Sequence, residues 1–311
     1  MRVKIGVIPG QWAWDGGGEA FLNFAENCEA WGWDSLWLSD RLVSDQMNLE
    51  PVTALAAVAA RTKTLKFGTS VLALALRNPA MLAKELATVD YLAGGRLLPA
   101  VGLGGDDERE YEATGGRKQE RGGRTDEAIG LLRRLWTEDH VTHHGKYYHL
   151  TDVSIRPRPR FKPYPPLWIG GRTEYAWRRV AAVGDGWITS SSTSDEVGAG
   201  IRSIKAGLQS NGRHIEDDHY GVLLLTYLAP SREQAMQRYT AGRRLRPDIA
   251  PESHALLGTA EDIIGKLREY VAAGATKFVF RLACPEAEVS QQLRLLADEV
   301  VRPVHGGSVT F

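Results

Sequence analysis

The chain has 311 residues, of which 43% are hydrophobic and 24% are charged, proportions typical of a globular protein with a sizeable core. Lys and Arg together number 38, as do Asp and Glu, so the formal net charge is zero. No overall field attracts nucleic acid or an anionic membrane, and neither is an expected partner.

The cysteines and the first residues predict a cytoplasmic protein. Cys28 and Cys284 are far apart, and the chain opens on strand-like RVKIGVI rather than on a basic segment followed by a long apolar one. No apolar stretch reaches the roughly 20 residues that a membrane-spanning helix needs. We therefore expect two separate thiols in a reducing compartment and no disulfide.

Strand-like and helix-like runs alternate along the chain, which is the pattern of parallel βα units. The expected strands are 3–8, 35–39, 66–70, 96–101, 167–170, 186–189, 220–228 and 277–281. The expected helices are 19–31, 52–61, 80–93, 124–137, 173–183, 195–211, 232–243, 260–273 and 286–301. This alternation favours an α/β fold, a closed (β/α)8 TIM barrel over residues 1–311, over an open doubly wound sheet.

Two stretches interrupt the alternation. Residues 138–166 have polar and aromatic residues around His144-Gly145-Lys146 and then several prolines, which predicts a hairpin followed by an extended segment. Residues 245–258 form a second irregular piece. We expect both to be insertions that cap the C-terminal mouth of the barrel.

The third expected strand ends in unusually small residues, within GTSVLALALRNP at 68–79. Gly68, Thr69 and Ser70 give up apolar volume that a core strand would use for packing. Since the C-terminal ends of barrel strands carry the active site, we interpret the small side chains as room for a flat ligand.

Three other strand ends carry candidate site residues. Asp40 and Arg41 follow the second strand, where Asp40 is either functional or a structural cap or ion-pair partner of Arg41. Gly104 and Gly105 lie in VGLGGDD, which lacks the Lys-Ser/Thr of a P-loop and predicts a turn or a closely approaching ligand. The run WIGGRT, with Gly170, Gly171, Arg172 and Thr173, opens a helix and favours an anion site over a simple strand-to-helix turn.

Two groups of aromatic or imidazole side chains are candidate ligand sites. His140, His143, His144 and His149 have no structural zinc spacing, so we expect exposed hairpin residues and no metal. Trp12 and Trp14 follow the first strand and either cover the barrel end or form rigid pocket walls for a planar ligand. We favour pocket walls.

Residues 3 to 285 resemble the bacterial luciferase-like monooxygenase superfamily, (β/α)8 barrels that include flavin- and deazaflavin-dependent oxidoreductases. The motifs that carry the resemblance are GTSVLALALRNPAMLAKELATVDYLAGGRLLPAVGLGG, EREYEATG, RTDEAIGLLRRLW and PLWIGGRTEYAWRRVAAVGDGWI. The resemblance implies a non-prolyl cis peptide at Ser70-Val71, placed behind the isoalloxazine-like ring, and a homodimer.

The resemblance also bears on the cofactor. Asp40 is the Asp that members using coenzyme F420 often carry after strand two, and GTSVL is similar to the F420 branch that includes glucose-6-phosphate dehydrogenase. The positions of that enzyme's catalytic His and Glu are Arg41 and Gly105 here. Oxidation of a sugar phosphate is therefore not the expected reaction.

The resemblance and the residues together predict an F420-dependent oxidoreductase that transfers a hydride between the deazaflavin and a small organic substrate. The alternatives are an FMN-dependent monooxygenase that uses reduced flavin and O2, and a non-catalytic flavin-binding barrel. The expected catalytic residues are Arg41 and Asp40. The expected cofactor contacts are Ser70 and Val71 behind the ring, Asp40 at its polar edge, Gly104 and Gly105 beside it, and Gly170, Gly171, Arg172 and Thr173 at the phosphate.

Overall fold

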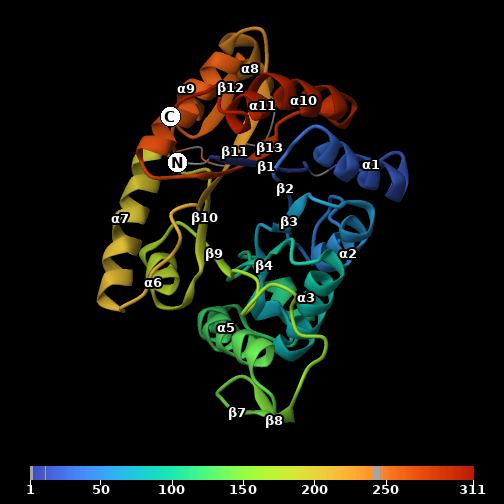
Figure 1. Cartoon of the computed structure of the whole chain (residues 1–311), viewed down its shortest axis with the longest axis vertical. Helices are drawn as coiled ribbons and strands as arrows, with labels where there is room; N and C mark the ends of the chain where they lie inside the picture. Colours follow the sequence, from blue (N-terminus) through green and yellow to red (C-terminus); the bar gives the residue numbers. More distant parts are fainter. Residues whose placement is uncertain (1–2, 11, 241–245, 247) are drawn as a thin grey trace. The chain divides into compact units, whose positions relative to one another are not determined.

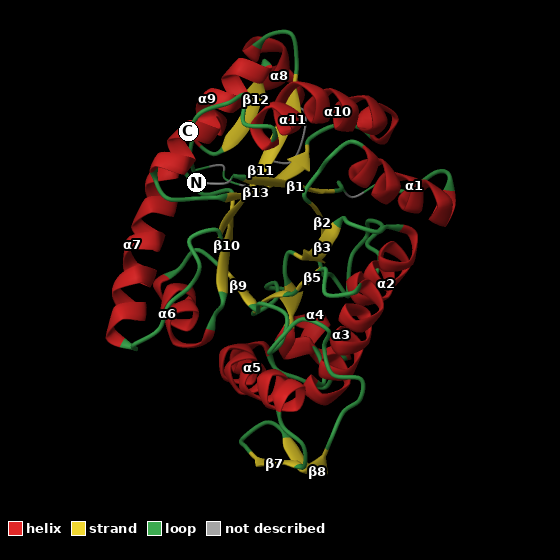
Figure 2. Ribbon diagram, viewed as in Figure 1, coloured by secondary structure: helices red, strands yellow, loops and turns green. Residues whose placement is uncertain are grey.

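The chain forms an α/β fold whose sheet pairings are parallel, apart from one antiparallel hairpin (Figures 1 and 2). The computed structural model describes residues 3–10, 12–240, 246 and 248–311. The chain divides into two compact units: unit 1 comprises Met1–Trp37 and Gly170–Phe311, and unit 2 comprises Leu38–Ile169.

The sheet of unit 1 is built from long, buried parallel strands. Its strand order is β10-β11-β13-β1-β2, and β12 pairs with the second half of β11. Val7 is opposite Phe280 in the register, and both side chains are buried. The strands are β1 (Lys4–Ile8), β2 (Ser35–Leu38), β10 (Gly186–Ser190), β11 (Tyr220–Leu228), β12 (Ala255–Gly258) and β13 (Lys277–Leu282).

Unit 1 also contains most of the helices. Threonine caps open three of them, at Thr173, Thr193 and Thr259, and the last two form capping boxes with an acidic residue three positions on. The helices are α1 (Gly17–Ala30), α6 (Glu174–Val183), α7 (Ser194–Ser210), α8 (Arg232–Thr240), α9 (Ala260–Ala272), α10 (Val289–Leu296) and α11 (Arg302–His305). A π-helical segment, η5 (Ala297–Val301), joins α10 to α11.

Unit 2 has shorter strands packed against its helices. β3 (Lys66–Thr69) pairs with β5 (Leu97–Leu98), whereas β4 (Leu72–Ala73) pairs with β6 (Ala100–Gly102), which pairs with β9 (Trp168–Gly170). The buried Trp136 donates from Nε1 to the carbonyl oxygen of Ala83 (3.0 Å). The helices are α2 (Pro51–Arg61), α3 (Pro79–Ala93), α4 (Glu108–Ala113) and α5 (Arg121–Thr137).

The structure contains every strand that the sequence predicts, with small shifts at the ends. The strand expected at 96–101 is divided at Pro99 into β5 and β6, and β4, α4 and β12 were not expected. The helix expected at 232–243 is described only as far as Thr240, because 241–243 lie outside the described residues. The α/β fold with parallel strands is therefore confirmed, while the closed barrel and the single domain stay predictions.

The hairpin expected within 138–166 is present, but it packs on α5. It consists of β7 (Val141–His144) and β8 (His149–Val153). Glu127 of α5 accepts hydrogen bonds from the backbone N–H groups of Tyr147 and Tyr148. These contacts hold the hairpin against α5, and Figure 1 shows β7 and β8 beyond that helix. The cap over the barrel mouth stays a prediction.

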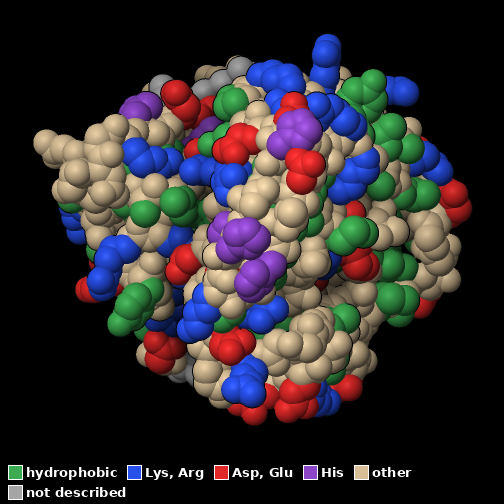
Figure 3. Space-filling model, turned by 90° about the horizontal axis from the view of Figure 1, so that it is seen from below, with side chains coloured by type: hydrophobic (Ala, Val, Ile, Leu, Met, Phe, Trp, Pro, Cys, Tyr) green, Lys and Arg blue, Asp and Glu red, His purple; other side chains and the backbone are tan. Residues whose placement is uncertain are grey.

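The hairpin histidines have carboxylate or imidazole neighbours. His143 is 3.0 Å from Glu127, His140 is 2.6 Å from Asp152, and the rings of His144 and His149 lie 6.3 Å apart. Figure 3 shows histidine side chains among acidic and basic ones on one face of the molecule.

The second irregular stretch, 245–258, lies partly outside the described residues, which exclude 245 and 247. Its described part contains a short 3-10 helix, η3 (Pro251–Ser253), and strand β12. The expectation of an irregular piece is therefore wrong for Ala255–Gly258, since backbone pairing with β11 makes this segment a strand.

Cys28 and Cys284 are free thiols, as expected. Burial raises the pKa of Cys284 to about 12 and raises that of Cys28 well above its ordinary value. No helix in the described part of the chain combines the length and the apolar character that a membrane crossing requires.

Candidate active site

The small residues at the end of β3 have structural reasons. A Cβ at Gly68 would overlap the carbonyl oxygen of Leu98 on the paired strand. The buried Thr69 hydroxyl donates to the carbonyl oxygen of Ala100 (2.7 Å) and accepts from its N–H (3.0 Å). These contacts correct our interpretation of Gly68 and Thr69 as room for a flat ligand, because strand packing alone requires them.

Strand β3 ends at Thr69, directly before a non-prolyl cis peptide bond. The peptide bond Ser70-Val71 is cis, which confirms the position that the resemblance implied. The N–H of Ser70 donates to the carbonyl oxygen of Leu38 at the end of β2 (2.7 Å). Ser70 and Val71 are both partly exposed.

Asp40 is the anchor of the segment that follows the cis bond. Its Oδ2 accepts from the N–H of Ala73 (3.0 Å) and from Nε of Arg77 (3.2 Å), and its Oδ1 accepts from Nη2 of Arg77 (2.9 Å). Asp40 therefore forms its ion pair with Arg77 rather than with the adjacent Arg41. A fork of two parallel bonds is the strongest form of carboxylate pairing.

Arg77 connects Asp40 to the start of α2. Its Nη2 also lies 3.0 Å from Oε1 of Glu50. Glu50 is the cap of that helix: its Oε1 accepts from the N–H of Val52 and its Oε2 from the N–H of Thr53. Burial is the largest single effect and opposes the charge of Arg77, but the hydrogen bonds and charges of Asp40 and Glu50 together outweigh it and raise the pKa of the guanidinium. Burial likewise opposes the charge of Glu50, yet its hydrogen bonds, led by Thr53, lower its pKa.

Arg41 lies between a glycine and a buried carboxylate. A Cβ at Gly105 would overlap Nη1 of Arg41, so the guanidinium occupies the place that a side chain at 105 would take. Nη1 is 3.7 Å from Oε2 of Glu110, whose side chain is 2% exposed, whereas that of Arg41 is 46% exposed. One part of the cation is thus held by the protein and another reaches solvent.

The glycine-rich loop after β6 is held by side chains from α4 and α5. Gly104 has φ = +87°, and a Cβ there would lie 2.9 Å from the hydroxyl oxygen of Tyr111 and 3.0 Å from Cβ of Ala73. The hydroxyl of Tyr111 is within hydrogen-bonding distance of the carbonyl oxygens of Leu103 (3.0 Å) and Gly105 (2.8 Å). Arg121 also donates to Gly105 O (2.8 Å). The loop conformation alone therefore requires glycine at 104.

The expected anion site opens α6 in unit 1. Gly171, Arg172 and Thr173 are exposed, and the hydroxyl of Thr173 accepts from the N–H of Ala176 as the helix cap (3.4 Å). This hydroxyl keeps its own proton for donation to an anion. The N–H of Gly171 donates to Ile188 O (3.2 Å), so that donor is already engaged.

Gly171 has a second structural role. Its φ is +134°, and a Cβ there would lie 2.7 Å from Cβ of Ala176. Its carbonyl oxygen accepts from Nε1 of Trp187 (2.7 Å). Close packing of the strand end against α6 thus requires glycine at this position, independently of any ligand.

Trp12 and Trp14 belong to an aromatic cluster with α1. Trp12 is 7% exposed and makes edge contacts with Trp14 (5.5 Å between ring centroids) and Phe24 (5.9 Å). Trp14 makes similar contacts with Phe21 and Phe24. These contacts favour the alternative interpretation, in which the two indoles are packing residues rather than pocket walls.

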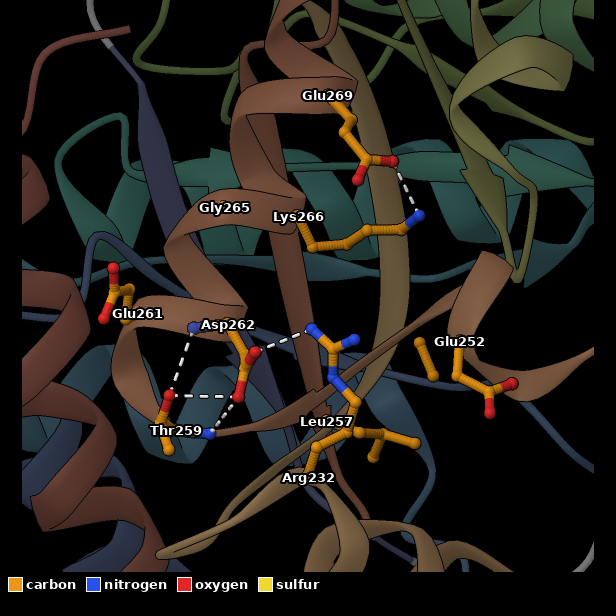
Figure 4. A pocket seen from close by; sticks show the side chains of 10 residues that line it. Arg232, Glu252, Leu257, Thr259, Glu261, Asp262, Gly265, Lys266 and Glu269 are labelled. Carbon is orange, nitrogen blue, oxygen red and sulfur yellow. Dashed lines mark hydrogen bonds and ion pairs between the residues drawn. The ribbon is translucent and has the colours of Figure 1, made fainter.

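A polar pocket of about 490 Å³ lies elsewhere in unit 1, between α9, β12 and the start of α8 (Figure 4). Arg232 pairs with Asp262 (2.6 Å) and Lys266 pairs with Glu269 (2.6 Å), so both of these basic side chains lining the pocket already have carboxylate partners. None of the predicted site residues lines it.

The structure thus gathers the predicted residues into two groups. Unit 2 holds Asp40, Arg41, Ser70, Val71, Gly104 and Gly105, and the segment Gly170–Thr173 lies in unit 1. Sequence reasoning missed Arg77 and Glu110, which bind Asp40 and Arg41. Both stand in motifs that carried the resemblance, LALRNP and EREYEATG, but neither follows a strand directly.

Solved structures share this architecture. One is an F420-dependent secondary alcohol dehydrogenase in complex with an F420-acetone adduct, with a TM-score of 0.83 and 21% identity over 98% of this chain and 99% of that one. Another is the FMN-bound oxygenating constituent of 3,6-diketocamphane monooxygenase from Pseudomonas putida, with a TM-score of 0.81 and 17% identity over 97% and 98%. At these identities the likeness shows the fold alone, that of an α/β enzyme.

The sequence comparisons identify the family. The model of luciferase-like monooxygenases matches residues 1–249, and the chain belongs to this family of oxidoreductases. It is 32% identical to an F420-dependent glucose-6-phosphate dehydrogenase of Microbacterium testaceum (strain StLB037), over 92% of this chain and 93% of the relative. It is 31% identical to an FMNH2-dependent dimethylsulfone monooxygenase of Pseudomonas putida over 54% of this chain and 46% of the relative.

Proposed function

We propose that this protein is an F420-dependent oxidoreductase that reduces a small organic acceptor with an activated double bond or carbonyl group. The observation that carries the proposal is the half-exposed guanidinium of Arg41, which lies beside Gly105 after β2. A fixed cation stabilises negative charge that develops on an acceptor, but it does not exchange protons at ordinary pH.

The chemistry of the residues expected at the phosphate and of those expected at the ring is compatible with F420. At the phosphate end, the exposed start of α6 offers a helix N-terminus, the proton of the Thr173 hydroxyl and the charge of Arg172. At the ring end, we propose contacts with Ser70 and Val71 and with Gly104 and Gly105. Asp40 is proposed at the polar edge. We also propose that the parallel strands close into a (β/α)8 barrel, as the family resemblance implies.

When bound, reduced F420 would supply a hydride. On an enone, hydride addition at the β-carbon moves an electron pair to the carbonyl oxygen, and Arg41 would donate hydrogen bonds to that oxygen. The completing proton comes from solvent, because the guanidinium keeps its own. Asp40 would act by fixing the backbone at Ala73, since both of its oxygens already accept hydrogen bonds.

Alcohol oxidation is a weaker candidate, although several relatives carry the name of a glucose-6-phosphate dehydrogenase. Oxidation of an alcohol needs a base that accepts its proton. By the resemblance, the His and Glu positions of that enzyme hold Arg41 and Gly105 here. The guanidinium of Arg41 stays protonated and Gly105 has no side chain, so neither residue can act as the base.

The test is steady-state oxidation of reduced F420 with a panel of enones. Arg41→Ala should lower turnover by roughly tenfold or more, equivalent to losing at least ~1.4 kcal/mol of transition-state stabilisation. Arg41→Lys should recover part of it, because the charge remains but the fork is lost. The matched control is Arg109→Ala, which removes an exposed arginine of α4 paired with Asp107.

The electrostatic role of Arg41 would be rejected if wild type oxidised alcohols with F420. It would also be rejected if Arg41→Ala were as active as wild type on every acceptor. Consumption of O2 by the protein with reduced FMN, without any F420 activity, would favour a monooxygenase instead.

A further inference from the structure

The carboxylate of Glu110 stands out among the buried charges of unit 2. It belongs to α4, a helix that Asp107 caps, and its side chain is 2% exposed. Its Oε1 accepts from the N–H groups of Leu42 (2.9 Å) and Val43 (3.3 Å), and its Oε2 faces Nη1 of Arg41 (3.7 Å). A carboxylate is retained at such a position only when donors and a cation compensate for its lost hydration.

The two carboxylate oxygens of Glu110 therefore have different roles. One fixes the backbone just after Arg41, and the other lies opposite the end of its side chain. Arginine has a long, flexible stem, and a half-exposed guanidinium would otherwise sample many rotamers. Gly105 leaves the space that the guanidinium fills, and Glu110 supplies the charge that keeps it there.

We propose that Glu110 is a positioning residue that orients the Arg41 guanidinium toward the acceptor oxygen. This inference rests on the proposed function, because it gives Arg41 a fixed direction for stabilising charge. An electrostatic contribution to catalysis depends on donors already aimed at the developing charge before the reaction begins. Glu110 touches neither the acceptor nor the cofactor in this scheme and acts only through Arg41.

A simpler alternative is that Glu110 only ties down the backbone at Leu42 and Val43. Glu110→Gln separates the two roles. The amide oxygen of Gln can still accept from both backbone N–H groups, but the negative charge opposite Arg41 is lost. Glu112→Gln is the matched control: it makes the same substitution at an exposed carboxylate of the same helix.

The kinetic experiment is a double-mutant cycle between Glu110→Gln and Arg41→Ala, with enone reduction by reduced F420 as the assay. We expect Glu110→Gln to lower kcat about fivefold while KM for the enone changes less than twofold. In the Arg41→Ala background it should have no further effect, and Glu112→Gln should stay within twofold of wild type. An equal loss in both backgrounds would overturn the proposal, since Glu110 would then act independently of Arg41.

A second measurement needs neither cofactor nor activity. The arginine reagent phenylglyoxal is applied to the protein, and modification of Arg41 is followed by peptide mass spectrometry. Release of the guanidinium should raise the rate of modification at Arg41 at least threefold in Glu110→Gln, whereas the rate in Glu112→Gln should match that of wild type. Hydrogen exchange at Leu42 and Val43 should stay as in wild type.

The two measurements fail separately. If wild type reduces no acceptor with F420, the proposed function is wrong, and the phenylglyoxal rates still decide whether Glu110 orients Arg41. If acceptors are reduced but the rate at Arg41 is the same in wild type and Glu110→Gln, the positioning role is wrong and the proposed function remains.

Discussion

Asp40 and Arg77 show how a single ion pair shapes the candidate site. The pair joins the segment after β2 to Ala73 in β4, and through Glu50 to the cap of α2. The side chain of Asp40 is 6% exposed and that of Arg77 is 20% exposed, so water screens their attraction little.

Asp40→Asn should lower the free energy of unfolding by about 1–3 kcal/mol, the usual cost of weakening a buried charged hydrogen bond. Asn keeps one acceptor for Ala73 but leaves the guanidinium of Arg77 without its bidentate partner. Urea unfolding of the variant and of wild type measures the difference. Glu112→Gln, at an exposed carboxylate, is the control, and equal stability of both variants would contradict the expected role of Asp40.

His305 is a second residue whose protonation state matters. Its Nε2 accepts from the N–H of Ile5 in β1 (3.0 Å), and its Nδ1 lies 3.1 Å from Gly32 O, so the neutral tautomer with a proton on Nδ1 satisfies both contacts. Burial lowers the pKa of His305, and the hydrogen bond to Gly32 offsets only part of that effect. Protonation would remove the acceptor for Ile5.

The unfolded chain therefore binds a proton at His305 more readily than the folded chain does. The free energy of unfolding should fall as pH drops below about 6.5, the ordinary value, with a slope of at most ~1.4 kcal/mol per pH unit from this group. His305→Gln should flatten the profile, because the variant has nothing to protonate there. Parallel profiles from pH 5 to pH 8 in thermal unfolding would contradict this assignment.

At the scale of elements, hydrophobic periodicity explains why the long strands were predicted from the sequence and why the short strands β4 and β12 were not. Long strands such as Tyr220–Leu228 are recognisable in the sequence, because burial on both faces of a parallel sheet selects a continuous run of hydrophobic residues. β4 has two residues and β12 has four, and both form because partners distant in sequence pair with them. No local pattern could specify such pairings.

Glycines at element ends provide a direct test. Gly171→Ala should lower the free energy of unfolding by more than 1 kcal/mol, because its positive φ disfavours a side chain and the new Cβ would press on Ala176. Gly130→Ala, in the middle of α5 with open space around it, should raise the same quantity by about 0.5–1 kcal/mol. Chemical denaturation of both variants decides the matter, and a stabilised Gly171→Ala would refute the packing argument.

At the scale of the whole molecule, composition set useful limits but did not reveal how charges pair. The neutral balance of 38 basic and 38 acidic residues excluded a general attraction to polyanions. It could not show that Arg41 pairs with Glu110, which depends on the tertiary fold. The homodimer and the cytoplasmic location stay predictions.

The protein should bind F420 more tightly than FMN. Titration of each cofactor against intrinsic tryptophan fluorescence measures both affinities. Arg172→Gln should weaken F420 binding severalfold by removing positive charge at the start of α6, whereas Arg178→Gln, exposed on the same helix and paired with Glu174, should not. Tighter binding of FMN would reverse the order of cofactors, and equal effects of the two variants would place the phosphate elsewhere.

The contact between Arg41 and Gly105 also constrains the order in which this site can evolve or be engineered. A side chain introduced at 105 would overlap the end of an arginine side chain rather than backbone, so it would displace the guanidinium and disturb its orientation more than the folding of the chain. Under the proposed function, a change at 105 made first would therefore displace the Arg41 cation before position 41 holds a histidine that can act as a base. Starting with Arg41→His empties the space and lets a glutamate enter at 105 afterwards. Changing position 41 before position 105 therefore avoids an intermediate in which a side chain at 105 overlaps the guanidinium of Arg41.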